Sequence, residues 1–173
     1  MIPALTKNGY LPHGRHSTTI EEVESQFVPP DNPVRQSMWS DWIALTDLIR
    51  ETVGELPAVW IGGSFVTSKD EPGDIDVVYV LKRETVLVLE PLQLSVLEII
   101  FEEKGHNLTG AVSPFFFYLE EMIDHTAALR NGDASNSLAA RGYWDQLWSR
   151  TRDSSKPAYP VRGYLEVIID DYQ

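Results

Sequence analysis

The sequence predicts a single α/β (α+β) domain spanning residues 1–173, in which helices flank a small mixed β-sheet. Three observations support this fold class. The chain has 173 residues, the length of one domain and enough to bury roughly 70% of the unfolded chain's surface. Segments with helical periodicity alternate with short runs rich in β-branched residues. No internal repeat, low-complexity tract or linker interrupts them.

Four segments have the periodicity of helices. Thr19 precedes Glu22 by three residues, the spacing of a capping box, so a short helix is expected from Ile20 onwards. Apolar residues then recur every three or four positions in three further segments, 38–53, 92–103 and 138–148. The polar stretch 131–136 is expected to be a loop.

Four short apolar segments are expected to be strands of the sheet. Residues 57–61 end at two glycines, and residues 75–81 are rich in valine and isoleucine. Residues 115–119 follow Pro114, and residues 163–169 form the last apolar run. These strands lie among the predicted helices in an order that suits a mixed sheet.

Composition and charge exclude several classes of protein. Without cysteine there is no disulfide framework, cysteine-based zinc site, iron–sulfur cluster or thiol nucleophile. The 14 Lys+Arg and 26 Asp+Glu residues give a net charge of −12, which argues against non-specific binding to nucleic acid. No apolar run approaches the length of a membrane span or of a signal peptide. We therefore expect a soluble, cytoplasmic protein with no membrane partner.

The residues that indicate chemistry lie at the end of the first predicted strand and the beginning of the second. Gly62, Gly63 and Ser64 follow one strand, and Asp74 and Asp76 begin the next. Residues two apart on a strand share a face, so both carboxylates point the same way, as a Mg²⁺ site requires. The bare glycine backbone can approach a ligand closely, and N–H groups near Ser64 can bind phosphate oxygens. The pattern predicts half of a nucleotidyl-transfer site.

This spacing resembles the signature of the polymerase-β-like nucleotidyltransferase superfamily, which has Gly-Ser followed by Asp-x-Asp between hydrophobic residues. The wider sequence is similar to a family of short nucleotidyltransferase-like proteins of bacteria and phages, in segments 11–16, 19–27, 63–69, 72–76, 143–144 and 162–163. The resemblance implies a nucleotidyltransferase fold, triphosphate contacts from Gly63 and Ser64, and Mg²⁺ or Mn²⁺ bound by the catalytic Asp74 and Asp76.

One departure from the superfamily pattern concerns catalysis. Superfamily enzymes usually have a third carboxylate on a later strand, which binds the catalytic metal and helps to deprotonate the attacking hydroxyl. At the corresponding place this chain has Pro114 and Phe115. Glu120, Glu121 or Asp124 can substitute only from the end of that strand.

Two functions follow as hypotheses. The first is a metal-dependent nucleotidyltransferase that moves a nucleoside monophosphate from an NTP such as ATP to a hydroxyl on a protein, a small molecule or an RNA end. Short members of the superfamily suggest a toxin–antitoxin or phage-defence setting, by analogy. The alternative is a catalytically degenerate relative that binds a nucleotide or a partner protein as a regulator or antitoxin.

Other conspicuous residues have simpler interpretations. Lys69 lies between the two halves of the motif, where it either binds a phosphate together with Gly62, Gly63 and Ser64 or is solvated. The aromatic residues Phe115, Phe117, Trp144 and Trp148 have strand or helix periodicity and are expected in the core. The acidic pair at 170–171 is expected to be a solvated tail.

Overall fold

The computed structural model describes residues 1–101, 110–120, 132–151 and 161–172, without the side chains of 133 and 134. Along the chain, the described elements are β1 (Gly14–Thr18), α1 (Ile20–Phe27), α2 (Pro33–Val53), β2 (Ala58–Ile61), β3 (Ile75–Lys82), α3 (Arg83–Leu87), α4 (Pro91–Phe101), β4 (Val112–Leu119), α7 (Gly132–Trp148) and β5 (Gly163–Ile168).

The strands form one five-stranded mixed sheet in the order β1-β5-β2-β3-β4. Strand β1 is parallel to β5 and β3 is parallel to β4, whereas β2 is antiparallel to both of its neighbours. The expected mixed α/β class, with a small mixed sheet flanked by helices, is confirmed.

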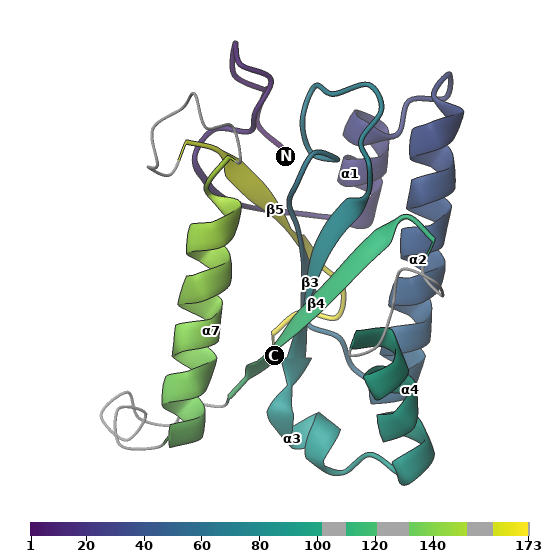
Figure 1. Ribbon diagram of the computed structural model, residues 1–173, viewed down its shortest axis with the longest axis vertical. Helices are drawn as coiled ribbons and strands as arrows, with labels where there is room; N and C mark the ends of the chain where they lie inside the picture. The colour runs from purple at the N-terminus through teal and green to yellow at the C-terminus, as the bar shows by residue number, and fades with distance from the viewer. Residues whose placement is uncertain (102–109, 121–131, 152–160, 173) are drawn as a thin grey trace.

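Helices cover both faces of the sheet unequally. Helices α1, α2 and α4 lie on one face, and α7 lies on the other (Figure 1). Alternate residues of β3 divide accordingly, since Val77 belongs to the core cluster with Ile49 of α2, whereas Val78 packs in a second cluster with Trp148 of α7. The period of two that defines a strand thus separates two cores.

The first two helices begin with side-chain caps. The Thr19 hydroxyl accepts a hydrogen bond from the N–H of Glu22, as the capping-box spacing predicted. Helix α2 begins at Pro33, five residues before the predicted start, and the Asn32 side chain accepts from the N–H of Arg35 at 3.0 Å. Proline suits the first turn, where its missing N–H costs no hydrogen bond.

Two elements were not predicted, and α7 and β4, like α2, begin earlier than predicted. Strand β1 has the polar sequence Gly-Arg-His-Ser-Thr, and α3 has five residues, so neither has an apolar repeat to detect. The expected loop 131–136 is wrong from residue 132 onwards, because α7 begins at Gly132. The Ser137 hydroxyl donates to the carbonyl of Tyr118 at 2.6 Å, which is one tertiary contact that holds this first part of the helix.

Strand β4 begins at Val112 and includes Pro114, which was expected to precede it. Among the described strands it lies at the edge of the sheet and pairs with β3 alone. Proline is tolerated in an edge strand because its nitrogen can face away from the neighbouring strand. No helix among the described residues is long and apolar enough to cross a membrane.

The end of β5 is fastened to α2, which corrects the expectation of a solvated acidic tail. Arg50 donates a hydrogen bond from Nε to Asp170 at 2.9 Å, and the N–H of Leu56 donates to the same carboxylate at 3.0 Å. The hydrogen bond from Arg50 lowers the pKa of Asp170 below its usual value.

This contact makes part of the stability depend on pH. Because the pKa of Asp170 is lower in the folded chain, its contribution is present above the unfolded-state pKa of about 4 and is lost as pH falls through the folded-state pKa. We expect Asp170→Asn to lower the free energy of unfolding at pH 7 by about 1 kcal/mol. Urea denaturation at pH 7 and at pH 3 measures this, and a difference that persists unchanged in acid would contradict it.

Candidate functional site

A cavity of about 800 Å³ lies where β2 ends and β3 begins. Its wall contains five of the six predicted site residues, namely Gly63, Ser64, Lys69, Asp74 and Asp76. The remaining lining residues come from the N-terminal segment, the loop after Ser64, β4, α7 and the segment before β5, and are Asn8, Gly9, Tyr10, Thr67, Ser68, Phe115, Tyr143, Trp144, Leu147, Trp148, Arg150, Thr151 and Arg162.

The glycine turn is packed directly against one of the two carboxylates. Gly63 has a positive φ of +67°, and a Cβ there would lie 1.9 Å from Oδ2 of Asp76. The N–H of Gly62 also donates to the backbone carbonyl of Asp76 at 3.0 Å. Only glycine suits both the conformation and the close approach, so the turn and the start of β3 form one unit.

Gly62 packs closely against α7. A Cβ at Gly62 would lie 2.6 Å from Cε3 of Trp148, and Gly62 is outside the cavity lining. Its missing side chain makes room for α7 to pack on the sheet. The structure therefore does not bring Gly62 to the cavity with the other predicted residues.

Asp74 and Asp76 lie at the same end of β3 and both are half-buried. The Ser113 hydroxyl on β4 donates to Oδ2 of Asp74 at 2.9 Å, which orients that carboxylate. Mg²⁺ is commonly held by one or two carboxylates together with water and the phosphates of a substrate. This pair of oxygen donors at a cavity wall fits such an ion.

Strand β4 offers no third carboxylate, because no residue of Val112–Leu119 is acidic. In the parallel register Asp76 is opposite Ser113, and Phe115 follows on the same face. Among the described residues, no group of three or more acidic, histidine or cysteine side chains could hold a metal ion.

Glu120 cannot substitute for the missing acid, which corrects that expectation. It follows the far end of β4, beyond the pair Lys82 and Leu119, and so lies roughly 20 Å along the strand from the pair Asp76 and Ser113. There it forms an ion pair with Arg83 at 3.2 Å. The other two candidates, Glu121 and Asp124, lie outside the described residues.

Arg162 is a cavity residue that the sequence did not reveal. It donates from a terminal nitrogen to the carbonyl of Gly63 at 3.3 Å and from Nε to the carbonyl of Trp148 at 3.1 Å. It therefore connects the glycine turn with the end of α7 and brings a positive charge to the cavity wall. Lys69 also lines the cavity and is exposed, in the loop after Ser64.

The loop between the two halves of the motif is held by Arg35, which is only 4% exposed. Its five side-chain hydrogen bonds all reach backbone carbonyls, at Phe27, Phe65, Thr67, Lys69 and Asp70. Burial lowers the pKa of the Arg35 guanidinium below its usual value. The burial of Arg35 could have been predicted from the sequence. Arg35 lies three residues before Met38 and seven before Trp42, which places it on the apolar side of α2.

The aromatic residues near the cavity divide into two groups. Phe117 and Trp148 are buried in the second core, as expected. Phe115 is 41% exposed, and Trp144 is half-buried, so their expected core positions are wrong in part. Tyr143, which is 60% exposed, joins them at the cavity.

Together these features define a mixed α/β protein with a polar cavity formed by a glycine turn, a pair of carboxylates and an aromatic wall. The chain belongs to the family of unknown function DUF6932, whose model matches residues 3–168. No curated protein and no solved structure matches the chain. The nucleotidyltransferase resemblance therefore stays a prediction.

Replacing Arg35 should destabilise the chain strongly. Lysine keeps the charge but has three donors on one nitrogen, so it cannot bind all five carbonyls. Among those in buried hydrogen bonds, at Phe27, Phe65 and Thr67, some then lose their partner. We expect Arg35→Lys to lower the free energy of unfolding by about 3 kcal/mol. Urea denaturation measures the change.

The matched control is Arg50→Lys, which alters an arginine of the same helix whose side chain is 51% exposed. Its cost should stay below about 1 kcal/mol. Equal costs for the two variants would mean that the carbonyl contacts do not stabilise the loop.

Proposed function

We propose that this chain is a metal-dependent nucleotidyltransferase, with a nucleotidyltransferase fold, that moves a nucleoside monophosphate from an NTP to a hydroxyl acceptor. One observation carries the proposal. The Gly63-Ser64 turn lies against Asp76 in the same cavity as Asp74, so groups suited to phosphate and to Mg²⁺ adjoin each other. The resemblance in motif spacing supports the same assignment.

Each half of the site has a separate task in this proposal. The backbone at Gly63 and the N–H groups near Ser64 bind oxygens of the triphosphate, and Lys69 and Arg162 add positive charge at the cavity wall. Asp74 and Asp76 would hold Mg²⁺ or Mn²⁺, which supplies charge neutralisation of the phosphates. Ser113 keeps Asp74 oriented through its hydrogen bond.

The transfer itself exchanges one phosphorus–oxygen bond for another. The acceptor hydroxyl oxygen forms a bond to the α-phosphorus, and the bond from that phosphorus to the bridging oxygen breaks. Pyrophosphate leaves with the electron pair, and the hydroxyl proton passes to solvent. Without an acid on β4, the chain contributes positioning and charge, and little help in deprotonating the acceptor.

The charge of the chain restricts the acceptor. A net charge of −12 disfavours a long nucleic acid, so a protein or small molecule is a better acceptor, and an RNA end is a further candidate. The superfamily resemblance suggests a toxin–antitoxin or phage-defence module, by analogy alone.

A second candidate function has its own support. Ser113 and Phe115 occupy the places on β4 nearest Asp76, where superfamily enzymes usually have an acid. This arrangement favours a degenerate relative that binds a nucleotide, or a partner protein, without turnover. Both candidates share the metal–nucleotide site and differ in the chemical step.

The shared site is tested by Asp76→Asn. Removing this charge takes away one of two metal ligands, so we expect Mg²⁺-dependent NTP binding to be abolished while the fold is retained. Isothermal titration calorimetry measures binding, and circular dichroism measures folding.

The charge-matched control is Asp47→Asn, an exposed carboxylate on α2 whose loss should leave NTP binding unchanged. If the double variant Asp74→Asn/Asp76→Asn binds Mg·NTP as well as the unaltered chain does, these two residues do not form the metal site.

The chemical step is tested by the choice of metal. With two carboxylates and no acid on β4, we expect either slow transfer that Mn²⁺ stimulates, since Mg²⁺ demands more ideal coordination, or no transfer. Each labelled NTP is incubated with the protein and a cell lysate, and pyrophosphate release and label transfer are measured. Fast transfer with Mg²⁺ would contradict this account, whereas no transfer with all four NTPs would favour the binding-only function.

A further inference from the structure

One end of the cavity is apolar and exposed, although it adjoins the charged groups. It consists of Phe115 on β4 and Tyr143, Trp144 and Leu147 on α7, here called the aromatic wall. Phe115 is 41%, Tyr143 60% and Leu147 44% exposed, so core packing does not explain these side chains. Large exposed apolar surfaces of this kind commonly mark binding sites.

The wall is supported from behind by the core. The ring of Trp144 lies 4.8 Å from that of Phe115 and 5.1 Å from that of Tyr143, measured between centroids. On its other side Trp144 contacts the buried Trp148 at 6.0 Å. The exposed rings are thus held in place before any ligand binds, which lowers the entropic cost of binding.

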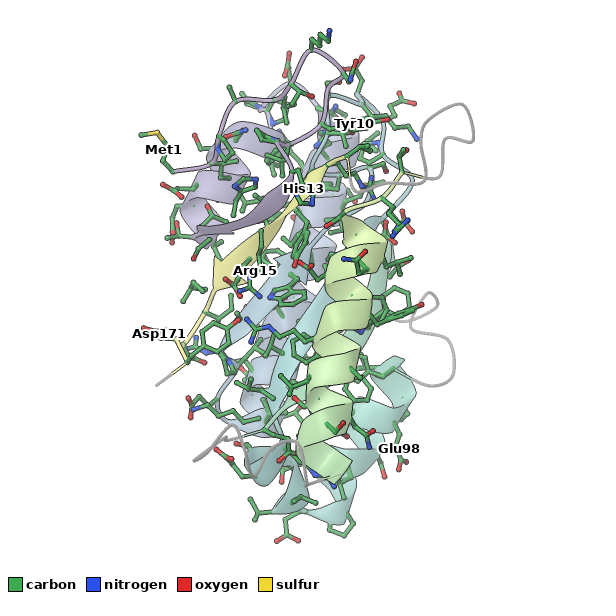
Figure 2. All side chains as sticks on the ribbon, turned by 90° about the vertical axis from the view of Figure 1, so that its left-hand side faces the viewer. Met1, Tyr10, His13, Arg15, Glu98 and Asp171 are labelled. Atoms are coloured by element: carbon green, nitrogen blue, oxygen red, sulfur yellow. The ribbon has the colours of Figure 1, made fainter. Side chains whose placement is uncertain are left out.

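The aromatic wall lies close to the two carboxylates in the same cavity. On β4, Phe115 is two residues from Ser113, the partner of Asp76 in the sheet. Helix α7 crosses this face of the sheet, as Figure 2 shows, and brings Tyr143 to the same cavity as Ser64. The cavity therefore contains the glycine turn, the two carboxylates and an apolar surface of tilted rings.

We propose that the aromatic wall stacks on the nucleobase of the NTP, with Tyr143 as the main contact, and selects purines over pyrimidines. The inference rests on the proposed function, because it assigns the base of the same nucleotide. An aromatic face binds any base, and a purine offers the larger area. Tyr143 and Trp144 alone supply polar atoms to the wall, so adenine and guanine are poorly distinguished.

Calorimetry with three ligands in Mg²⁺ tests the base contact. ATP carries a purine, UTP carries a pyrimidine, and inorganic tripolyphosphate carries the phosphates alone. For the unaltered chain we expect ATP to bind about tenfold more tightly than tripolyphosphate, with UTP between them. Tyr143→Ala should raise the Kd for ATP by about tenfold and leave that for tripolyphosphate unchanged.

Two variants separate stacking from a structural effect. Tyr143→Phe keeps the ring and should bind ATP as the unaltered chain does. Leu138→Ala truncates an exposed residue of the same helix, outside this cavity, and should change neither Kd.

The outcomes distinguish this inference from the proposed function. If ATP and tripolyphosphate bind equally well, or if Tyr143→Ala weakens both alike, base stacking is wrong and the metal–phosphate site stands. If UTP binds as tightly as ATP, the purine selection is wrong. If neither ATP nor tripolyphosphate binds, both the proposed function and the base contact are wrong.

Discussion

The shape of the cavity depends on the buried guanidinium of Arg35. The loop after Ser64 turns four of its carbonyls toward Arg35, and a buried carbonyl without a partner is costly. Arg35 supplies a donor to each of its five carbonyl partners in a fixed planar arrangement. Because α2 is itself held by Trp42 and Ile49 in the core, the loop takes its position from the helix.

The sequence could predict those parts of the site that follow from local geometry. The two-residue period of a strand placed Asp74 and Asp76 together, and the glycines at 62 and 63 marked a close approach, which for Gly62 is to Trp148. Arg35 could not be assigned its role, since its partners are backbone carbonyls that any residue type supplies. Likewise β1 is defined by pairing with β5 along a polar sequence that has no repeat.

Unequal coverage of the sheet explains the remaining differences. Helices α1, α2 and α4 cover one face, so apolar periodicity there predicts burial well. On the other face α7 is the one helix among the described residues. Residues near its margin, such as Phe115 and Trp144, have the pattern of core residues but are not fully covered. Periodicity indicates which side of an element a residue occupies, and burial depends in addition on what packs against that side.

Pro114 affects whether the sheets of two copies of this chain can pair edge to edge. An edge strand presents a row of free N–H and C=O groups that can recruit a strand from a second chain, which is a common start of aggregation. Among the described strands β4 lies at an edge of the sheet, and its sequence is strongly apolar. A proline in an edge strand turns its nitrogen outward, so the outer row lacks one donor at Pro114. A second molecule therefore cannot extend the sheet past this point with an unbroken ladder.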